Sequence, residues 1–127
     1  MVSVVAMLDA CWRAEVGVED QDGSRDSPVV VYGDFEWDDD KSLENERERG
    51  LPFRLALTLF EDPRRIDPYD SRMENGERRH ALVATLGPEA PSIWRDRPLV
   101  CVYMFRNDRI RIISLRVASR KERRSYR

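Results

Sequence analysis

The chain has 127 residues, of which 41% are hydrophobic and 36% charged, and its formal net charge is −2. This length and composition are typical of one globular domain with a very polar surface. No apolar run approaches the roughly 18 residues of a membrane-spanning helix, and the N-terminus lacks the basic start of a secretory signal, so neither feature is expected.

The first 28 residues are expected to form an extension outside the main domain, which would span residues 29–127. Residues 1–16 carry apolar side chains at helix-like spacing. The polar stretch GVEDQDGSRDSP, residues 17–28, is typical of a linker or a disordered loop. The sequence leaves open whether the N-terminal segment is an appended helix, a tag-like extension or the result of an upstream start codon.

A strand and a helix are predicted next. VVVYGDFEW, residues 29–37, is β-branched and aromatic and favours a strand, with Gly33 as a bend or bulge. Asp38–Asp40 provide an N-cap and acids for the first turn of a helix. This helix covers Lys41–Arg49, and Gly50 is a suitable left-handed residue to end it.

A second helix is expected directly after the first. Pro52 suits its first turn, and Asp62-Pro63 ends it. Its core face is predicted from apolar side chains at helical spacing: Phe53, Ala56, Leu57 and Phe60. Residues 61–78 are then expected to be a polar connection that ends in the turn signal ENGE.

Three strands and a short helix are predicted for the rest of the chain. The strands are HALVATLG at 80–87, LVCVYMF at 99–105 and RIRIISLR at 109–116. A proline-rich loop separates the first two, and Asn107-Asp108 form the tip of a tight turn between the last two. Ser119 and Glu122 form a capping-box pattern, which begins a short C-terminal helix.

This order of elements predicts an α+β fold. Two N-terminal helices would pack on one face of a small antiparallel sheet, followed by the short C-terminal helix. The other face of the sheet would stay open to a ligand. Strict alternation along the last strand would place Ile110, Ile112, Ser114 and Arg116 on one face and Arg109, Arg111, Ile113 and Leu115 on the other. The last strand therefore does not identify the functional face by itself.

Positive charge is concentrated at the C-terminal end of the chain. Residues 1–33 hold six acids and two bases, and residues 34–94 hold fifteen acids and nine bases, whereas residues 95–127 hold three acids and eleven bases. A surface of this charge suits an anion such as RNA, DNA or an acidic protein. No helix-turn-helix or ribbon-helix-helix pattern is visible, which argues against a DNA-binding protein.

The cysteines indicate no metal site. Cys11 and Cys101 lie far apart without a CxxC pair, and the chain has a single histidine. Cys101 lies within LVCVYMF and is expected to be a buried small hydrophobic residue. A reducing cytoplasm is the expected location.

Four motifs, in order, resemble those of BrnT-type toxins, which are small ribonucleases with a RelE-like fold from type II toxin–antitoxin pairs. The first is FEWDDDKSLENERERGLPF, in which the family pattern is met by Phe35, Glu36, Trp37, Asp38, Lys41, Asn45, Gly50 and Phe53. The others are LFEDP at 59–63, GERR at 76–79, and RIRIISLRVA at 109–118 followed by Glu122, Arg123 and Tyr126. The resemblance covers about residues 34–127.

The chain departs from the family pattern at three places. Asp39 stands where the family has a proline, and Glu48-Arg49 stand where it has a lysine and a histidine. The proline-rich loop 87–98 is also longer. If the family histidine takes part in catalysis, this chain acts without it or Arg49 partly substitutes for it.

The resemblance implies metal-independent RNA cleavage with no cofactor, in which the 2′-OH attacks the neighbouring phosphate. The protein must then align the reacting atoms, stabilise negative charge and move protons, and arginine suits the second task. The candidate catalytic residues are Arg79, Arg111, Arg116 and Tyr126. Candidate RNA-binding residues are Lys41, Arg109 and Arg123. His80 is the candidate base because it is the single imidazole.

Each candidate also has a structural interpretation. An arginine on a small sheet is commonly solvated or ion-paired, and acids of the first helix are candidate partners for Arg111 and Arg116. Lys41 is also typical of an exposed helix charge, and His80 of an incidental residue at a strand start. Tyr126 is equally placed to pack the last helix.

The function expected from the resemblance is a ribonuclease toxin that inhibits translation and is neutralised by a cognate antitoxin. That antitoxin would be a BrnA-like ribbon-helix-helix protein, in a toxin–antitoxin hetero-oligomer or beside a toxin homodimer, with no membrane involved. The alternative is a catalytically inactive relative. It would bind a partner protein or nucleic acid through the basic C-terminal surface.

Overall fold

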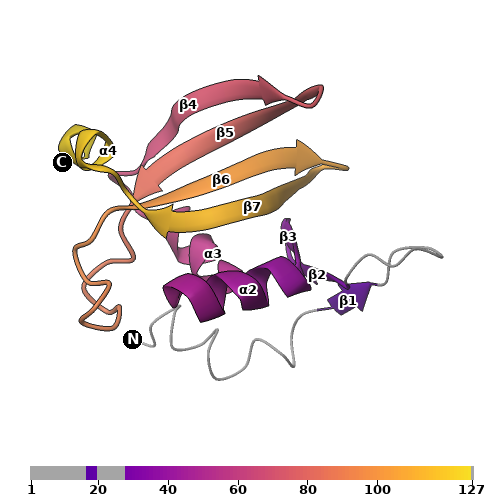
Figure 1. The fold of residues 1–127 in the computed structure, drawn as a ribbon, viewed down its shortest axis with the longest axis horizontal. Helices are drawn as coiled ribbons and strands as arrows, with labels where there is room; N and C mark the ends of the chain where they lie inside the picture. The colour runs from indigo at the N-terminus through magenta and orange to yellow at the C-terminus, as the bar shows by residue number, and fades with distance from the viewer. Residues whose placement is uncertain (1–16, 20–27, 127) are drawn as a thin grey trace.

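The computed structural model describes residues 17–19 and 28–126, which form a seven-stranded sheet in the order β1-β2-β3-β7-β6-β5-β4 (Figure 1). The strands are β1 (Gly17–Glu19), β2 (Val29–Tyr32), β3 (Phe35–Asp38), β4 (Ile66–Glu74), β5 (Glu77–Ala84), β6 (Leu99–Arg106) and β7 (Arg109–Val117). The helical segments are α2 (Asp39–Arg49), the 3-10 turn η1 (Phe53–Leu55), α3 (Ala56–Leu59) and α4 (Arg120–Ser125). The α+β class is confirmed.

The N-terminal part of the sheet differs from the expected single strand. Gly33 has a φ of 59°, and the chain turns there so that β2 and β3 form an antiparallel hairpin. A left-handed φ is readily adopted by glycine, which has no Cβ to clash. Gly17–Glu19, expected in a polar linker, pair with β2 as a further strand. The helix expected over residues 1–16 lies outside the described residues.

The expected antiparallel sheet is in fact mixed. β3 pairs parallel to β7, with Phe35 opposite Ile110 and Trp37 opposite Ile112. This pairing covers three residues, and α2 then runs along the rest of the β7 edge (Figure 1). The side chain of Asn45 donates to the carbonyl of Leu115 at 2.9 Å, so α2 satisfies a backbone group that a neighbouring strand would otherwise bind.

The expectation of a second long N-terminal helix is wrong. The segment after Pro52 is one 3-10 turn followed by the single turn of α3. In this segment the backbone leaves the α-helix after Leu59 and continues in turns, with i→i+3 hydrogen bonds from Glu61 to Thr58 and from Asp62 to Leu59. Its apolar spacing is still used, since Phe53, Ala56 and Leu57 are all buried in the core.

The polar connection expected at 61–78 contains a strand, β4, which forms a hairpin with β5. Asn75 and Gly76 make the turn with φ values of 53° and 78°, as the ENGE signal predicted. β4 is an edge strand and most of its residues are exposed. An exposed edge strand needs no alternation of apolar and polar residues, so the sequence of β4 lacks the pattern by which a strand is recognised.

Helix ends follow the local signals. Asp38 caps α2 by accepting a hydrogen bond from the N–H of Lys41, and Gly50 ends it in the left-handed conformation. Ser119 and Glu122 form the predicted capping box of α4. The short C-terminal helix is thus confirmed. None of the described helices is long and apolar enough to cross a membrane.

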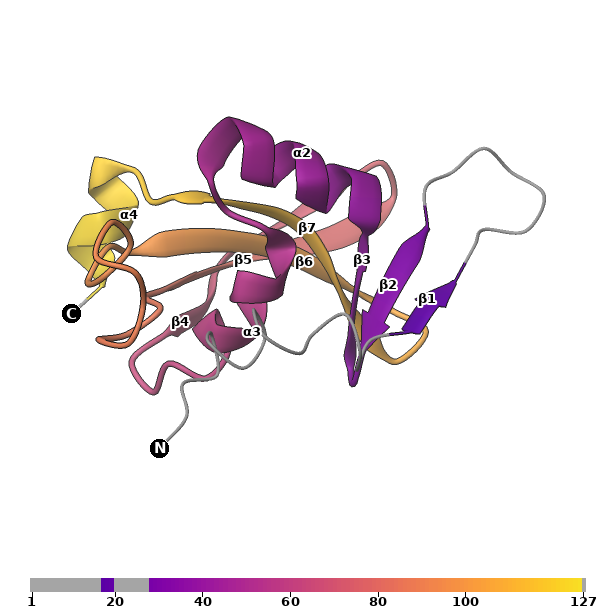
Figure 2. The same ribbon diagram turned by 90° about the horizontal axis from the view of Figure 1, so that it is seen from below.

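The two faces of the sheet are covered unequally. The main core lies between one face of the sheet and the helical segments η1 and α3. Its largest fully buried side chains include Trp37, Phe53, Leu59, Leu82 and Ile112. A smaller cluster around Val83, Val100 and Ala118 lies on the other face, where Tyr126 packs against it. Figure 2 shows α4 at one end of the sheet and α3 beneath it. Most of the second face therefore stays open.

Candidate functional site

A β-bulge in β7 decides which arginines share a face. Tyr103 of β6 is opposite Ile112, but Val102 is opposite Ser114, so Ile113 is an extra residue on β7. Arg111 and Arg116 consequently lie opposite Met104 and Val100, two β6 residues on the same face. The strict alternation expected for this strand is wrong, and both arginines lie on the open face.

The open face carries arginines from four strands and is called the arginine face below. Cross-strand pairing places them on one side: Arg72 of β4, Arg79 of β5, Arg106 of β6, and Arg109, Arg111 and Arg116 of β7. Acidic residues of the same strands, including Asp70 and Glu74, alternate with them. The face therefore carries both positive and negative side chains and is not uniformly positive.

Two hollows on this face contain most of the candidate residues. The α4 hollow, of about 200 Å³, is lined by Asp70, Arg72, Glu74, Arg79, His80, Ala81, Val102, Arg116 and Glu122. The α2 hollow, of about 160 Å³, is lined by Asp38, Lys41, Glu77, Arg79, Met104, Arg106, Arg111, Ile112 and Ile113. Arg79 lines both hollows and thus links Arg116 on one side with Lys41 and Arg111 on the other.

Arg116 is held by Glu122 in a bidentate ion pair. Its two terminal nitrogens donate to the two carboxylate oxygens at 2.8 and 2.9 Å, and Glu122 also accepts from the Ser119 N–H. The hydrogen bond from Arg116 and those from Ser119 outweigh burial and lower the pKa of Glu122 to about 2. The Arg116 side chain remains 38% exposed, so solvent and solutes can reach the guanidinium.

Arg111 is in a different environment. It donates to Glu36 of β3 at 2.7 Å, and the side chains are only 12% and 7% exposed. Arg109 lies 3.9 Å from the same carboxylate and is more exposed. The partner acids of Arg111 and Arg116 therefore come from β3 and α4, not from the acidic helix α2.

The side chain of Arg79 is three-quarters buried, and only part of its hydrogen-bonding capacity is used. Its Nη1 donates to Glu74 at 3.3 Å, while its buried Nε has no hydrogen-bond partner among the described residues. Arg72 beside it pairs with Asp70 at 2.7 Å and is largely solvated. The guanidinium of Arg79 thus retains donor capacity at the boundary of the two hollows.

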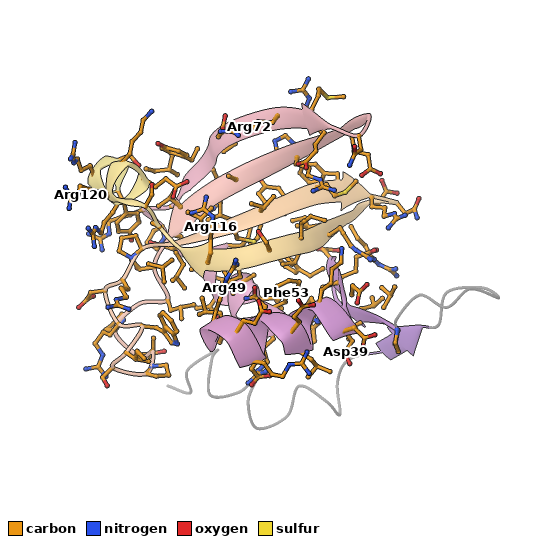
Figure 3. The ribbon with its side chains drawn as sticks, viewed as in Figure 1. Asp39, Arg49, Phe53, Arg72, Arg116 and Arg120 are labelled. Atoms are coloured by element: carbon orange, nitrogen blue, oxygen red, sulfur yellow. The ribbon has the colours of Figure 1, made fainter. Side chains whose placement is uncertain are left out.

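The other candidate cations lie at the margins. Lys41 is exposed in the first turn of α2, where it lines the α2 hollow. Arg123 is exposed on α4 but lines neither hollow. In Figure 3 Arg72 extends from β4 and Arg116 from β7, while Arg120 projects from α4 away from the sheet.

His80 is turned to the opposite face of the sheet. Its Nδ1 lies 2.8 Å from the hydroxyl of Ser71, and its ring contacts those of Tyr103 and Phe105. The strand segment around His80 contributes to the α4 hollow, but strand alternation directs its ring away from Arg79 and Arg116. The fold does not bring this imidazole together with the arginines.

Tyr126 belongs to a third location, outside both hollows. Its hydroxyl donates to Asp62 at 2.5 Å and lies 3.1 Å from Thr85. Burial, followed by the hydrogen bond to Asp62, raises the pKa of Tyr126, so its proton is held more tightly. Arg64 lies over its ring at 5.4 Å. This geometry matches the interpretation in which Tyr126 anchors α4.

Arg49, at the position of the family histidine, has a structural contact. Its Nη1 donates at 3.3 Å both to Asn45 and to the carbonyl of Leu115. Figure 3 shows its side chain rising from α2 toward β7, below Arg116. Arg49 therefore reinforces the α2–β7 contact next to the α4 hollow.

Sequence reasoning missed the acids that organise the site. Glu36 lies between two aromatic residues in a strand, and this isolated charge was a signal that it would face a cation. Glu122 was recognised as a cap but not as the partner of Arg116. Asp70 and Glu74 lie in β4, the strand that had not been predicted. Missing β4 therefore concealed the position of three residues that line the α4 hollow, Asp70, Arg72 and Glu74.

No group of three or more His, Cys, Asp or Glu side chains among the described residues could hold a metal ion. Cys101 is fully buried in the core, as predicted, and burial raises the pKa of its thiol. It is thus a packing residue rather than a reactive one.

Comparison with known families supports the motif resemblance. A family model described as "Ribonuclease toxin, BrnT, of type II toxin-antitoxin system" matches residues 37–122, more than half of the chain. No curated protein matches the chain significantly. The matched segment includes every residue that lines the two hollows.

Proposed function

We propose that this chain, which belongs to the BrnT family of ribonuclease toxins of type II toxin–antitoxin systems, cleaves RNA on its arginine face. In the proposed reaction the 2′-hydroxyl of RNA gives up its proton to a carboxylate of the α4 hollow, and its oxygen attacks the adjacent phosphorus. The bond from phosphorus to the 5′-oxygen breaks, and that oxygen leaves as a hydroxyl after taking a proton. The products carry a 2′,3′-cyclic phosphate and a 5′-hydroxyl, and no metal ion is required.

The observation that carries the proposal is the bulge at Ile113. It places Arg111 and Arg116 on one face, with Arg79 lining both hollows between them. The nucleophile belongs to the substrate, so the protein mainly has to orient the phosphate and stabilise its additional negative charge. Guanidinium groups that converge on one surface suit this task because they bind phosphate oxygens in pairs.

Arg116 and Arg79 are the proposed phosphate-contacting residues. The ion pair of Arg116 with Glu122 is partly solvated, because 38% of the Arg116 side chain is exposed. Exposed pairs contribute about 0–1 kcal/mol, and a bidentate pair lies at the upper end of this range or above it. A phosphate that binds Arg116 in the same bidentate way would compensate for the loss of Glu122 as its partner. Arg79 lines the same hollow, and its one hydrogen bond among the described residues, to Glu74 at 3.3 Å, uses only one of its terminal nitrogens.

The remaining residues receive supporting roles in the proposal. Arg111 positions β7 against β3 through Glu36, and it borders the α2 hollow. Lys41 and Arg109 bind the RNA backbone at the edge of the face, and Arg123 extends this contact along α4. Proton transfer is assigned to two carboxylates that line the α4 hollow, Asp70 and Glu74, in place of His80.

The biological role proposed for the reaction is inhibition of translation by cleavage of RNA in the cytoplasm. A cognate antitoxin, a ribbon-helix-helix protein of the BrnA type, would neutralise the toxin in a hetero-oligomer. Support for this part comes from family membership. The mixed charges of the arginine face would offer pairing sites to such a partner.

The direct test is cleavage of single-stranded RNA by purified protein. Arg116→Ala and Arg79→Ala should each reduce the cleavage rate about 100- to 1,000-fold, the effect of removing one donor from a transition-state anion. Arg120→Ala is the matched control, because it removes an exposed arginine from α4 that points away from the sheet. Cleavage should persist with a chelator, and 2′-deoxy substitution of the substrate should abolish it.

Expression in a bacterial host provides a second readout. Wild type should arrest growth and degrade RNA, whereas Arg116→Ala should do neither at equal protein level. Arrest by both proteins, with RNA intact, would contradict the ribonuclease.

The second candidate function is a binding module without catalysis. Two observations favour it: Arg111 is already neutralised by a buried carboxylate, and Arg49 supports the β7 backbone where the family has a histidine. Such a module would bind RNA or a partner protein without changing it. The cleavage assay separates the two functions when binding is measured on the same samples.

A further inference from the structure

The two C-terminal hairpins separate at one end of the sheet. The β5–β6 ladder ends at the pair His80 and Tyr103. Each hairpin continues further, because β4 and β5 pair as far as Glu74 and Glu77, and β6 and β7 extend to their tight turn. The ends of β5 and β6 beyond His80 and Tyr103 thus lack the hydrogen bonds that would close the sheet.

This separation leaves a cavity of about 440 Å³, called the hairpin cleft here. It is lined by Glu77, Arg78, His80, Met104, Phe105 and Arg106. Glu77, Met104 and Arg106 also line the α2 hollow. The hairpin cleft therefore adjoins the arginine face and extends to the opposite face of the sheet.

An aromatic platform lies on the far side of the hairpin cleft. Phe105 is 63% exposed, one of the most exposed large hydrophobic side chains among the described residues. Its ring centroid is 5.6 Å from that of His80 and 5.8 Å from that of Tyr103. These neighbours hold the Phe105 ring in place while one surface stays free. An exposed, oriented aromatic ring is a surface on which a nucleobase stacks.

The charges around this platform are suited to a nucleotide. Arg78 and Arg106 line the hairpin cleft on either side, and neither forms an ion pair with a described residue. Glu77 is the single acid in the lining. Aromatic stacking between two cations is the arrangement by which single-stranded nucleic acids are commonly bound. A hydrophobic peptide would use the ring but not the two guanidinium groups.

We propose that the hairpin cleft binds an unpaired nucleotide of the RNA substrate, with its base stacked on Phe105 beside His80 and its phosphates on Arg78 and Arg106. This inference rests on the proposed function and extends it. The RNA backbone runs from the α2 hollow through the cleft, past the residues that line both. A base in this position cannot be paired, so the site selects single-stranded RNA.

The test measures the binding of two non-cleavable probes of equal length. One is a 2′-O-methyl oligonucleotide of mixed sequence, and the other is a chain of abasic sugar phosphates. Phe105→Ala should weaken binding of the first about five- to hundredfold, the range for one stacked base, and leave the second unchanged. Phe105→Tyr keeps the ring and should bind like wild type. Arg78→Ala should weaken the binding of both probes.

A control on the same face is Met73→Ala, which removes another exposed apolar side chain and should leave both affinities unchanged. Equal affinity of Phe105→Ala and wild type for the mixed-sequence probe would overturn the inference. So would a loss confined to binding of a copurified antitoxin, because the ring would then be a protein contact. If wild type neither binds nor cleaves RNA, the proposed function itself fails, which is a separate outcome.

Discussion

Two ion pairs on the arginine face use the same chemistry in opposite ways. Arg111 with Glu36 and Arg116 with Glu122 both have nitrogen–oxygen distances below 3 Å. The first pair is buried where β7 meets β3, whereas the second lies at the end of β7 under the edge of α4. Position in the fold, more than residue type, thus separates an arginine that joins strands from one that a ligand can reach.

The buried pair joins two strands, whereas the partly exposed pair can be reached by solvent and solutes. Removing one partner of a buried pair leaves an uncompensated charge in a medium that solvates it poorly. A partly solvated pair loses little when it opens, because water takes the place of each partner. The comparison therefore predicts distinct consequences for stability and for binding.

The largest expected effect is on stability. Arg111→Ala should lower the free energy of unfolding by up to about 3–5 kcal/mol. Glu36 would stay buried with only Arg109, 3.9 Å away, to compensate its charge. Arg116→Ala should lower it by about 1 kcal/mol or less. Urea unfolding of both variants measures the difference. Equal losses would break the comparison.

A double variant serves as the control for this prediction. Arg111→Met combined with Glu36→Leu removes both charges and keeps apolar volume, so most of the lost stability should return. If the double variant were as unstable as Arg111→Ala, side-chain packing rather than the unpaired charge would explain the loss.

Acidification is expected to have a smaller effect on the stability of the fold. The pKa of Glu122 is about 2 in the folded chain, against 4.5 without its partners. Because the folded-state pKa is the lower one, the stabilisation is complete above pH 4.5 and is lost as the pH falls toward 2. Since Arg116 is more than a third exposed, we expect a loss of about 1 kcal/mol.

The free energy of unfolding, measured from neutral pH into this acid range, tests the contribution of the Arg116–Glu122 ion pair. Glu122→Gln has no charge to lose there, so its stability should fall less than that of wild type over the same range. Parallel curves for the two proteins would show that Glu122 does not stabilise the fold through Arg116.

The smallest expected effect is on the salt dependence of RNA binding. Each phosphate contact with single-stranded RNA contributes about 0.7 to the slope of log affinity against log salt. Arg116→Ala should reduce the slope by about this amount. The folded double variant at Arg111 and Glu36 should keep the slope of wild type, because Arg111 is already neutralised. Titration with a non-cleavable oligonucleotide at several salt concentrations measures both.

Much of the local structure was predictable from short-range signals. Asp38 and Gly50 mark the two ends of α2, and Ser119 with Glu122 marks the start of α4. These ends were predictable because caps act through hydrogen bonds within a few residues. The turn at Asn107-Asp108 also follows from residue type, since both adopt positive φ. Failures occurred where these signals were weak, as in the polar edge strand β4.

The candidate site was predictable in its residues but not in its arrangement. Motif position pointed to Arg79, Arg111 and Arg116, and the hollows contain all three. The orientation of His80 toward Tyr103 and the anchoring of Tyr126 by Asp62 depend on contacts between distant segments. Residue type alone carries no information about such contacts.

Sequence signals alone were sufficient for the α+β class, the helix caps, the tight turns and the family of the chain, although not for the strand β4. These properties depend on side chains close together along the chain. Only the tertiary structure decided which arginines share a face, through the bulge at Ile113, and which are neutralised, through partners such as Glu36, 75 residues away from Arg111. Strand register and burial are set by the packing of the whole sheet, and they determine which charges remain available to a phosphate.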